Sequence, residues 1–267
     1  MISKNQIKLI RQLEQKKYRQ REGLFVAEGP KVVGDLLRAG WQPQTVYATE
    51  EFSLTRSTPL DGAVNTEICV VTPDELRRIS FLQHPQQVLA LFSLPTSPTT
   101  PGLLPSATKR IQEGSEAGLL SIALDGVQDP GNLGTIIRIA DWFGIETIYC
   151  SPDTVDAWSP KVVQATMGSV ARVNIIYIPL EDLLRSTPLP VYGTLLDGRD
   201  IYQEPLAAEG IIVMGNEGRG ISPGIRQWVK CPLLIPSFRQ GETAESLNVA
   251  VATAITLSEF RRRHIRS

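Results

Sequence analysis

The 267-residue sequence contains few of the residues that bind metals or form cross-links, with only three cysteines and two histidines. Cys69, Cys150 and Cys231 are far apart in the chain, and each lies in an apolar stretch. Isolated cysteines in such surroundings are usually buried thiols, so we expect three buried free thiols and no disulfide. Two histidines are also too few to indicate a zinc site. The sequence therefore predicts no bound metal.

Long hydrophobic runs are also absent from the sequence. No stretch approaches the roughly 20 apolar residues that a membrane-spanning helix needs. The first residues, Met1–Asn5, lead into no apolar core of a signal peptide. A hydrophobic content of 42% and a charged content of 21% are typical of a globular protein. We expect a cytoplasmic protein with no membrane partner.

The chain carries no strong charge of either sign, because its formal net charge is −1. Net charge alone therefore does not indicate a nucleic-acid-binding protein. Basic residues nevertheless cluster at both ends: Lys4, Lys8, Arg11, Lys16, Lys17, Arg19 and Arg21 at the start, and Arg261, Arg262, Arg263 and Arg266 at the end. Such clusters are typical of solvated helix faces or of phosphate contacts, and the sequence alone leaves both readings open.

One segment divides the chain. Residues 95–118 are rich in Pro, Ser, Thr and Gly and have no apolar periodicity, which predicts a linker. The linker separates an N-terminal domain, residues 1–94, from a C-terminal domain, residues 119–267. Both lie near the usual size of a protein domain.

Helix and strand patterns alternate in both domains. The N-terminal domain reads as a small α/β domain that begins with a basic helix. Its further elements are strands at Leu24–Val26, Thr45–Ala48, Ile68–Val71 and Gln87–Phe92, a helix from Pro30 to Gly40, and a short helix capped by Thr72 and Glu75.

The C-terminal domain contains strands that are apolar throughout. We expect strands at Leu119–Leu124, Thr147–Cys150, Val173–Ile178, Val191–Leu195, Ile211–Met214 and Leu233–Ile235, and helices at Thr135–Phe143, at Pro160–Val170 and from Ser246 to the terminal arginines. Strands of this kind are typical of a parallel sheet covered on both faces. Ligands of such sheets bind at the carboxyl ends of the strands.

The first segment whose residues could bind a ligand or take part in catalysis is Asp125–Arg138, DGVQDPGNLGTIIR. A loop rich in Gly and Asn enters a helix that carries Arg138. Free backbone N–H groups and the helix dipole suit such loops to anions. The local pattern also allows a plainer reading, in which Asn132 is a helix-capping residue and Arg138 a surface charge.

Two further segments follow predicted strands. Met214–Ser222, MGNEGRGIS, has glycines at 215, 218 and 220 that let the backbone pass close to another group. Its order differs from the GxGxxG of dinucleotide-binding proteins. Glu217 could bind a ligand hydroxyl or hold this loop. In the third segment, Ile235–Asn248, Ser246 and Asn248 lie where the last helix begins, which is a capping position by default.

The three segments, in their order and in their amino-acid sequences, together resemble the motifs of the SpoU/TrmH family of RNA ribose methyltransferases, within the SPOUT superfamily. DPGNLGTIIRIA is similar to the first family motif, VMGNEGRGIS to the second and AESLNVAVATAI to the third. The resemblance covers residues 119–263. KKYRQREGLFVAEGPKVV in the N-terminal domain is similar to the substrate-binding module of many members. One departure is that the chain between Pro236 and Ser246 is a few residues longer than usual, which affects the expected shape of this loop.

The resemblance implies a C-terminal SPOUT domain with a parallel sheet and a deep trefoil knot. It further implies S-adenosylmethionine as cofactor, bound in a bent shape by the knot loops. Members are homodimers with the active site near the dimer interface. The implied reaction is methylation of a ribose 2′-hydroxyl in RNA, and the additional N-terminal domain favours ribosomal RNA as the substrate.

The resemblance also assigns roles to individual residues. Arg138 binds a phosphate and stabilises the ribose oxygen, because a guanidinium holds its proton too firmly to act as the base. Asn132, Ser246 and Asn248 orient the nucleotide or Arg138, and Glu217 braces the site. The expected cofactor contacts are made by the backbone at Leu195, Gly215, Ile235 and Leu247. A side chain at Gly215 is expected to occupy space that the cofactor needs. We expect Lys16, Lys17, Arg19 and Arg21 to add RNA affinity.

Three alternatives stay open at this point. The substrate could be a transfer RNA, or the chain could be an RNA-binding member of the fold that has lost catalysis. The loss of catalysis is argued against by the presence of all four motif residues: Asn132, Arg138, Glu217 and Asn248. A small-molecule NAD enzyme is the third alternative, and the missing GxGxxG pattern argues against it.

Overall fold

The computed structural model describes residues 2–54, 66–95, 120–239, 241 and 244–264. The chain forms two compact units: Met1–Thr96 with Asp156–Arg172, and Ser97–Val155 with Val173–Ser267. Of the predicted linker, residues 95–118, all but Pro95 lie outside the described residues. The domain bounds expected from the sequence, 1–94 and 119–267, stay a prediction.

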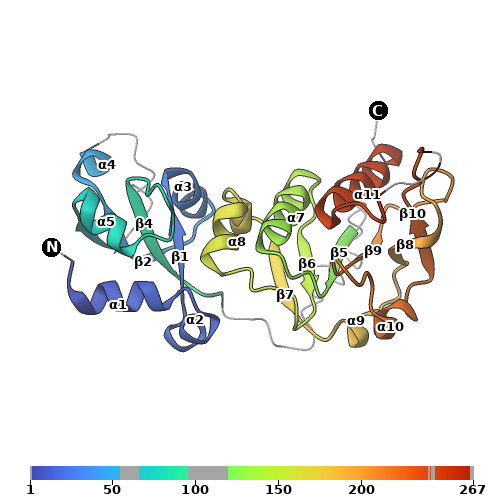
Figure 1. The fold of residues 1–267 in the computed structure, drawn as a ribbon, viewed down its shortest axis with the longest axis horizontal. Coiled ribbons are helices and arrows are strands. Elements are labelled where there is room, and N and C mark those ends of the chain that lie inside the picture. The colour runs from blue at the N-terminus through green and yellow to red at the C-terminus, as the bar shows by residue number, and fades with distance from the viewer. Residues whose placement is uncertain (1, 55–65, 96–119, 240, 242–243, 265–267) are drawn as a thin grey trace. The chain divides into compact units, whose positions relative to one another are not determined.

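The first unit is built on a four-stranded sheet in the order β1-β4-β2-β3. Only β2 and β3 are parallel, and β4 pairs antiparallel with both β1 and β2. The strands are β1 (Leu24–Glu28), β2 (Pro43–Ala48), β3 (Glu67–Val70) and β4 (Val88–Ser93), and the helices are α1 (Lys4–Gln12), α2 (Lys16–Glu22), α3 (Pro30–Arg38), α4 (Glu50–Leu54) and α5 (Pro73–Ile79) (Figure 1). The expected small α/β architecture is confirmed.

A segment from the second half of the sequence completes this unit. Residues Asp156–Arg172 contain α8 (Pro160–Ala165), which contacts β1, and a short 3₁₀ turn, η2 (Ser169–Ala171), which contacts α3. The ring of Trp158 lies 4.8 Å from that of Phe25 between their centroids. The helix predicted at Pro160–Val170 ends at Ala165, because Met167 and Gly168 take positive φ angles of 52° and 96°.

Arg19 of α2 is held by the same segment. Its guanidinium is buried, donates to the carboxylate of Asp156 over 3.1 Å, and donates to the carbonyl oxygens of Leu13 and Glu14 over 2.7 Å each. A buried and fully paired guanidinium cannot reach an RNA phosphate. The expectation that Arg19 adds RNA affinity is therefore wrong, and its charge serves the fold.

The second unit contains a six-stranded, all-parallel sheet in the order β10-β8-β9-β5-β6-β7. This arrangement confirms the parallel sheet expected from the apolar strands. The strands are β5 (Leu120–Asp125), β6 (Thr147–Cys150), β7 (Asn174–Tyr177), β8 (Val191–Asp200), β9 (Gly210–Gly215) and β10 (Cys231–Leu234), and the helices are α7 (Pro130–Trp142), α9 (Leu180–Ser186), α10 (Pro223–Arg226) and α11 (Val249–Arg263). The trefoil knot implied by the resemblance stays a prediction.

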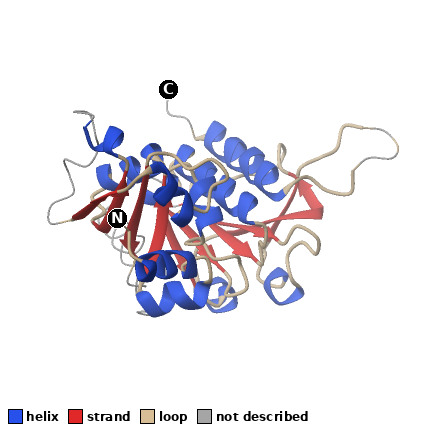
Figure 2. Cartoon of the chain, turned by 60° about the vertical axis from the view of Figure 1, so that its left-hand side comes forward, coloured by secondary structure: helices blue, strands red, loops and turns tan. Residues whose placement is uncertain are grey.

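Helices cover both faces of this sheet. Helices α7 and α11 pack on each other, and they contact β6 and β9 respectively. On the opposite face, Leu183 and Leu184 of α9 and Ile225 of α10 join Ile211 and Val213 of β9 in one apolar cluster. Figure 1 shows the two helix pairs on opposite sides of the sheet, and Figure 2 shows helices flanking the strands in a second view. The loops at the carboxyl ends of the strands are left open to form a site.

The two helices next to the first and third motifs begin elsewhere than predicted. α7 begins at Pro130, five residues before the predicted Thr135, because the Asp129 side chain accepts a 2.8 Å hydrogen bond from the backbone N–H of Asn132. Pro130 then occupies the first helical position, which it favours. α11 begins at Val249, and Asn248 is its N-cap.

The arginines at the end of α11 serve the fold. Arg261 donates to the carbonyl oxygens of Phe143 (2.8 Å) and Gly144 (3.1 Å) at the end of α7. Arg262 and Arg263 both pair with the buried carboxylate of Glu259. Arg263 also donates to the carbonyl oxygens of Ile201 and Tyr202 in the β8–β9 connection. The sequence left open whether this cluster is a solvated helix face or contacts phosphate. For the three described arginines these contacts favour a structural role.

Glu259 gives the fold a measurable pH dependence. Its hydrogen bond with Arg262, opposed by burial and reinforced by Arg263, lowers the pKa of Glu259 from 4.5 to about 2. A lowered pKa means that this carboxylate stabilises the fold above about pH 4.5 and that the contribution is lost as the pH falls toward 2. We expect Glu259→Gln to lower the melting temperature at pH 7. At pH 3 the difference in melting temperature between the variant and the wild type should be smaller. A difference that is independent of pH would contradict this assignment.

The cysteines follow their prediction in part. All three are free, and burial raises the pKa of the Cys150 thiol. Only Cys150 is fully buried, whereas Cys69 and Cys231 are half-buried, so the expected burial is wrong for these two. Within the described ranges, no helix is long and apolar enough to cross a membrane.

Candidate active site

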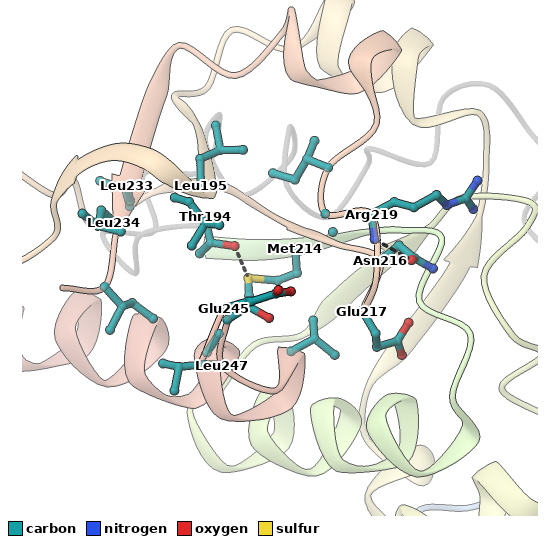
Figure 3. Close-up of a pocket in the computed structure, with 18 of the residues that line it drawn as sticks. Thr194, Leu195, Met214, Asn216, Glu217, Arg219, Leu233, Leu234, Glu245 and Leu247 are labelled. Carbon is teal, nitrogen blue, oxygen red and sulfur yellow. Dashed lines mark hydrogen bonds between the residues drawn. The ribbon is translucent and has the colours of Figure 1, made fainter. Parts of the chain in front are cut away.

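A cavity of about 480 Å³ lies at the carboxyl ends of β8, β9 and β10 (Figure 3). The pairing of β8 explains why it opens here. Tyr192 and Gly193 pair with the first residues of β10, but the next pair joins Arg199 to Leu233, so residues 194–198 bulge out of the ladder. This bulge forms one wall of the cavity. The loop after β9, the end of β10 and the residues before α11 form the others.

The predicted cofactor-binding residues all line this one cavity. Leu195 comes from the bulge of β8, Gly215 from the end of β9, Ile235 from the end of β10 and Leu247 from the approach to α11. Ser246 lines it as well. Sequence positions up to 52 residues apart thus meet at one place, and their cofactor contacts stay a prediction. The longer loop between Pro236 and Ser246 includes residues outside the described part of the chain, so its conformation is not assigned.

The second motif folds back on itself after β9. Asn216 and Gly220 exchange two backbone hydrogen bonds of 2.9 Å, and the Asn216 side chain accepts from the N–H groups of Gly218 and Arg219. A Cβ atom at Gly215 would lie 2.2 Å from the backbone of both Gly220 and Ile221. The group that passes close to Gly215 is therefore the loop's own backbone, and this contact alone requires glycine, before any cofactor is considered.

Glu217 joins the second motif to the first. One carboxylate oxygen accepts from the backbone N–H of Asp129 (3.1 Å) and from the Asn132 side chain (3.0 Å), and the other accepts from the N–H of Gln128 (3.2 Å). Burial by itself raises the pKa of Glu217, but these hydrogen bonds outweigh it and hold the pKa below its ordinary value. Of the two roles left open by the sequence, these contacts favour holding the loop.

Asn132 and Asn248 connect the first motif to the third. The Asn248 amide donates to the Asn132 side-chain oxygen over 2.9 Å, while its own oxygen caps α11 by accepting from Ala250 and Val251. The chain Glu217–Asn132–Asn248 thus fixes the three motifs against one another. Asn132 itself is not the N-cap of α7, because Asp129 occupies that position.

Arg138 lies apart from this network. It is exposed on α7, and it does not line the cavity. Among the described residues its guanidinium has no hydrogen-bond or ion-pair partner. The structure therefore joins Asn132, Glu217 and Asn248 and places Ser246 on the cavity. Arg138 is exposed outside this cavity.

Several functional candidates were missed by the sequence analysis. Asn216 organises the second motif, and its position directly after an apolar strand was the available signal. The ion pair of Asp197 and Arg226 lies at the cavity wall, and Glu245 lines the cavity beside Ser246. No local pattern marks these residues, because they meet only through the bulge in β8. No group of three or more His, Cys, Asp or Glu that could hold a metal is found in the described part of the chain.

Comparison with known proteins decides the family. The sequence profile of the SpoU rRNA Methylase family matches residues 119–258, which is more than half of the chain. The chain belongs to the SpoU rRNA methylase family. Every residue that lines the cavity lies within this match. A second profile, the MRM3-like substrate binding domain, matches residues 4–90. Both parts of the resemblance read from the sequence are thereby confirmed.

Individual relatives of this SpoU family member span its whole length. The chain is 30% identical to the Bacillus subtilis 23S rRNA (guanosine(2553)-2′-O)-methyltransferase RlmP, over 97% of both chains. A structure of a putative RNA methyltransferase of the TrmH family from Porphyromonas gingivalis matches with 41% identity and a TM-score of 0.83, over 98% of this chain and 99% of that one. An AdoMet-bound rRNA methyltransferase from Sinorhizobium meliloti matches with 31% identity and a TM-score of 0.82, over 100% and 98%.

Proposed function

We propose that this protein transfers a methyl group from S-adenosylmethionine to a ribose 2′-hydroxyl of ribosomal RNA. The observation that carries the proposal is one cavity lined by the second and third motifs, to which hydrogen bonds of Asn132 with Glu217 and Asn248 connect the first motif. The relative RlmP, which matches over the full chain, is named as a 23S rRNA 2′-O-methyltransferase and supports both the reaction and the substrate. The cytoplasmic location expected from the sequence is part of this proposal.

The cavity fits S-adenosylmethionine in size and in lining. Its volume of about 480 Å³ lies within the roughly 300–1,000 Å³ of small-molecule sites. Apolar side chains of Leu195, Met214 and Leu247 line it beside backbone of the glycine-rich loop, and such a lining suits the adenine ring of the cofactor. The AdoMet-bound relative from Sinorhizobium meliloti supports this cofactor. When bound, the cofactor supplies an activated methyl group, and the protein supplies position and charge.

The residues around the cavity then have two separate roles, one in positioning the loops and one in binding the RNA. The Glu217–Asn132–Asn248 chain holds the three loops in one geometry, which favours in-line approach of the ribose oxygen. A guanidinium is a poor base, so Arg138 acts by binding the phosphate next to the target ribose and by stabilising negative charge on the 2′ oxygen. The proton of the hydroxyl passes to water or to a phosphate oxygen.

A test separates this function from its nearest rivals. The purified full-length protein is titrated with S-adenosylmethionine, with NAD and with ribosomal RNA, and methyl transfer to RNA is then measured. We expect binding of the first and third ligands, no binding of NAD, and transfer. Binding of RNA and cofactor without transfer would instead identify a catalytically silent member of the family.

We propose that two copies of the chain pair through the face of α7 that carries Arg138. Thr135, Arg138 and Trp142 all lie on one exposed side of this helix, and Trp142 is 85% exposed. Val251 of the neighbouring α11 adds a further apolar side chain that is 48% exposed. Burial of this face by a second copy would bring Arg138 to a site shared by two protomers, outside its own cavity.

The dimer makes a direct prediction. Sedimentation at micromolar concentration is expected to give about twice the chain mass of 29.4 kDa. Trp142→Glu should shift this equilibrium toward the monomer, because it places a charge in the interface. Trp142→Phe is the matched control and should leave the mass unchanged. A wild-type monomer that still methylates RNA would contradict the proposal.

We expect the first unit to add RNA affinity through the exposed side of α2. Lys17 and Arg21 are exposed, and their charged groups lie 4.8 and 4.7 Å from the centroid of the Tyr18 ring. Lys16 is also exposed. Changing Lys16, Lys17 and Arg21 to glutamine should weaken RNA binding and flatten its salt dependence, because fewer counterions are released. Arg19 is left intact because it is buried.

The matched control changes three exposed basic residues of the second unit, Arg185, Arg199 and Lys230, to glutamine. Filter binding at several salt concentrations compares the two variants, and calorimetry checks that cofactor affinity is unchanged. Equal losses of RNA affinity in both variants would show that α2 contributes only net charge.

A further inference from the structure

Glu245 is one of the two charged side chains of the cavity that have no partner among the described residues. Five charged side chains line the cavity: Asp197, Glu217, Arg219, Arg226 and Glu245. Asp197 and Arg226 form an ion pair with each other. Glu217 is engaged by the first motif through three hydrogen bonds.

The charged side chains that remain are those of Arg219 and Glu245, and they point in different directions. Figure 3 shows the Arg219 side chain extending away from the other labelled residues, whereas Glu245, which is exposed, is drawn in front of Met214. Among the described residues, the Glu245 carboxylate has no hydrogen-bond or ion-pair partner. The apolar side chains of Met214 and Leu247 line the same cavity, and Glu245 itself is exposed to solvent. The side of the cavity that Glu245 lines is thus complementary to a ligand that carries a positive charge.

We propose that Glu245 is a specificity residue that recognises the positive sulfonium of S-adenosylmethionine and thereby distinguishes the cofactor from its product. This inference rests on the proposed function. In the transfer, the bond from sulfur to the methyl carbon breaks, sulfur keeps the electron pair, and a new carbon–oxygen bond forms on the ribose. The sulfur of S-adenosylhomocysteine is therefore neutral. Glu245 attracts the substrate form of the cofactor and loses that attraction once the methyl group has left, which favours exchange of the product.

The effect on catalysis follows from the same charge change. The positive charge on sulfur decreases toward the transition state, so Glu245 stabilises the bound cofactor more than the transition state. Glu245 therefore contributes to cofactor affinity, and its removal is expected not to lower the rate at saturation. A residue that merely shaped the loop would affect all ligands of the cavity alike.

Calorimetry on the full-length protein tests the proposal with three ligands: S-adenosylmethionine, S-adenosylhomocysteine and sinefungin, in which a charged amine replaces the methylated sulfonium. Glu245→Gln is expected to weaken S-adenosylmethionine and sinefungin by roughly three- to tenfold, the size of one partly screened charge contact. S-adenosylhomocysteine should change by less than about twofold. Glu209→Gln removes the same charge from an exposed residue just before β9, at the opposite end of that strand from the cavity, and should change none of the three affinities.

The outcomes separate the claims. An equal loss for all three ligands would overturn the assignment, and so would an unchanged ratio between S-adenosylmethionine and S-adenosylhomocysteine. A lower single-turnover rate at saturating cofactor, without a change in affinity, would also overturn it. A wild-type protein that binds neither the cofactor nor its product would instead remove the proposed function itself.

Discussion

Arg138→Ala is expected to lower the single-turnover rate of methyl transfer by about a hundredfold or more, as removal of other oxyanion-stabilising donors does. Its affinity for S-adenosylmethionine should stay at the wild-type value. The physical reason is position: Arg138 is exposed on α7 and does not line the cavity in which the cofactor is proposed to bind. The charge of its guanidinium is free to meet a phosphate and a developing alkoxide, and neither exists in the binary complex.

Two variants make this result specific. Arg138→Lys keeps the charge but loses the planar fork that binds two phosphate oxygens, so an intermediate rate is expected. Thr135→Ala changes the same exposed side of α7 without removing charge and should transfer methyl groups normally if that face is otherwise intact. Calorimetry gives cofactor affinity, and sedimentation shows whether the dimer persists. Normal transfer by Arg138→Ala would refute the catalytic assignment, and loss of cofactor binding would show that the two roles are not separable.

Gly215→Ala is expected to weaken S-adenosylmethionine binding by roughly ten- to a hundredfold, as overpacking by 1–3 kcal/mol would. The added Cβ would lie 2.2 Å from backbone atoms of Gly220 and Ile221. No rotamer relieves this contact, because the position of Cβ is set by the backbone. The loop of the second motif must therefore open, and one wall of the cavity moves with it.

Gly218→Ala in the same loop is the matched control. A Cβ at Gly218 meets no atom closer than the Asn216 side-chain oxygen at 3.7 Å, so cofactor affinity should change little. Comparing thermal melting with calorimetry shows whether Gly215→Ala acts on the loop or on the whole unit. Wild-type affinity in Gly215→Ala would mean that this loop does not shape the cofactor site.

The architecture of the second unit could be predicted because its signals are local. Apolar strands such as Leu120–Asp125 and Gly210–Gly215 predict a parallel sheet, and the three motifs follow such strands. The start of α7 was missed because capping by Asp129 depends on backbone geometry that the polar pattern does not reveal. The meeting of Glu217 with Asn132 depends on how two loops 85 residues apart fold together.

Other features could not be predicted because they depend on long-range packing. Arg19 looks like its neighbours Lys16 and Lys17 in the sequence, and only the position of Asp156 makes it a buried structural residue. The packing of Asp156–Arg172 with the N-terminal unit has no local signature either. Likewise, nothing in the chain marks Glu245 as different from other glutamates until the cavity around it is formed.

The most direct test of the central claim is a map of ribose methylation in the RNA of cells with and without this gene, repeated after complementation by the Arg138→Ala variant. The account predicts that one 2′-O-methylated nucleotide of ribosomal RNA disappears with the gene, returns with the wild type and does not return with the variant. Loss of a methyl group from a base, loss only in transfer RNA, or full restoration by Arg138→Ala would contradict it.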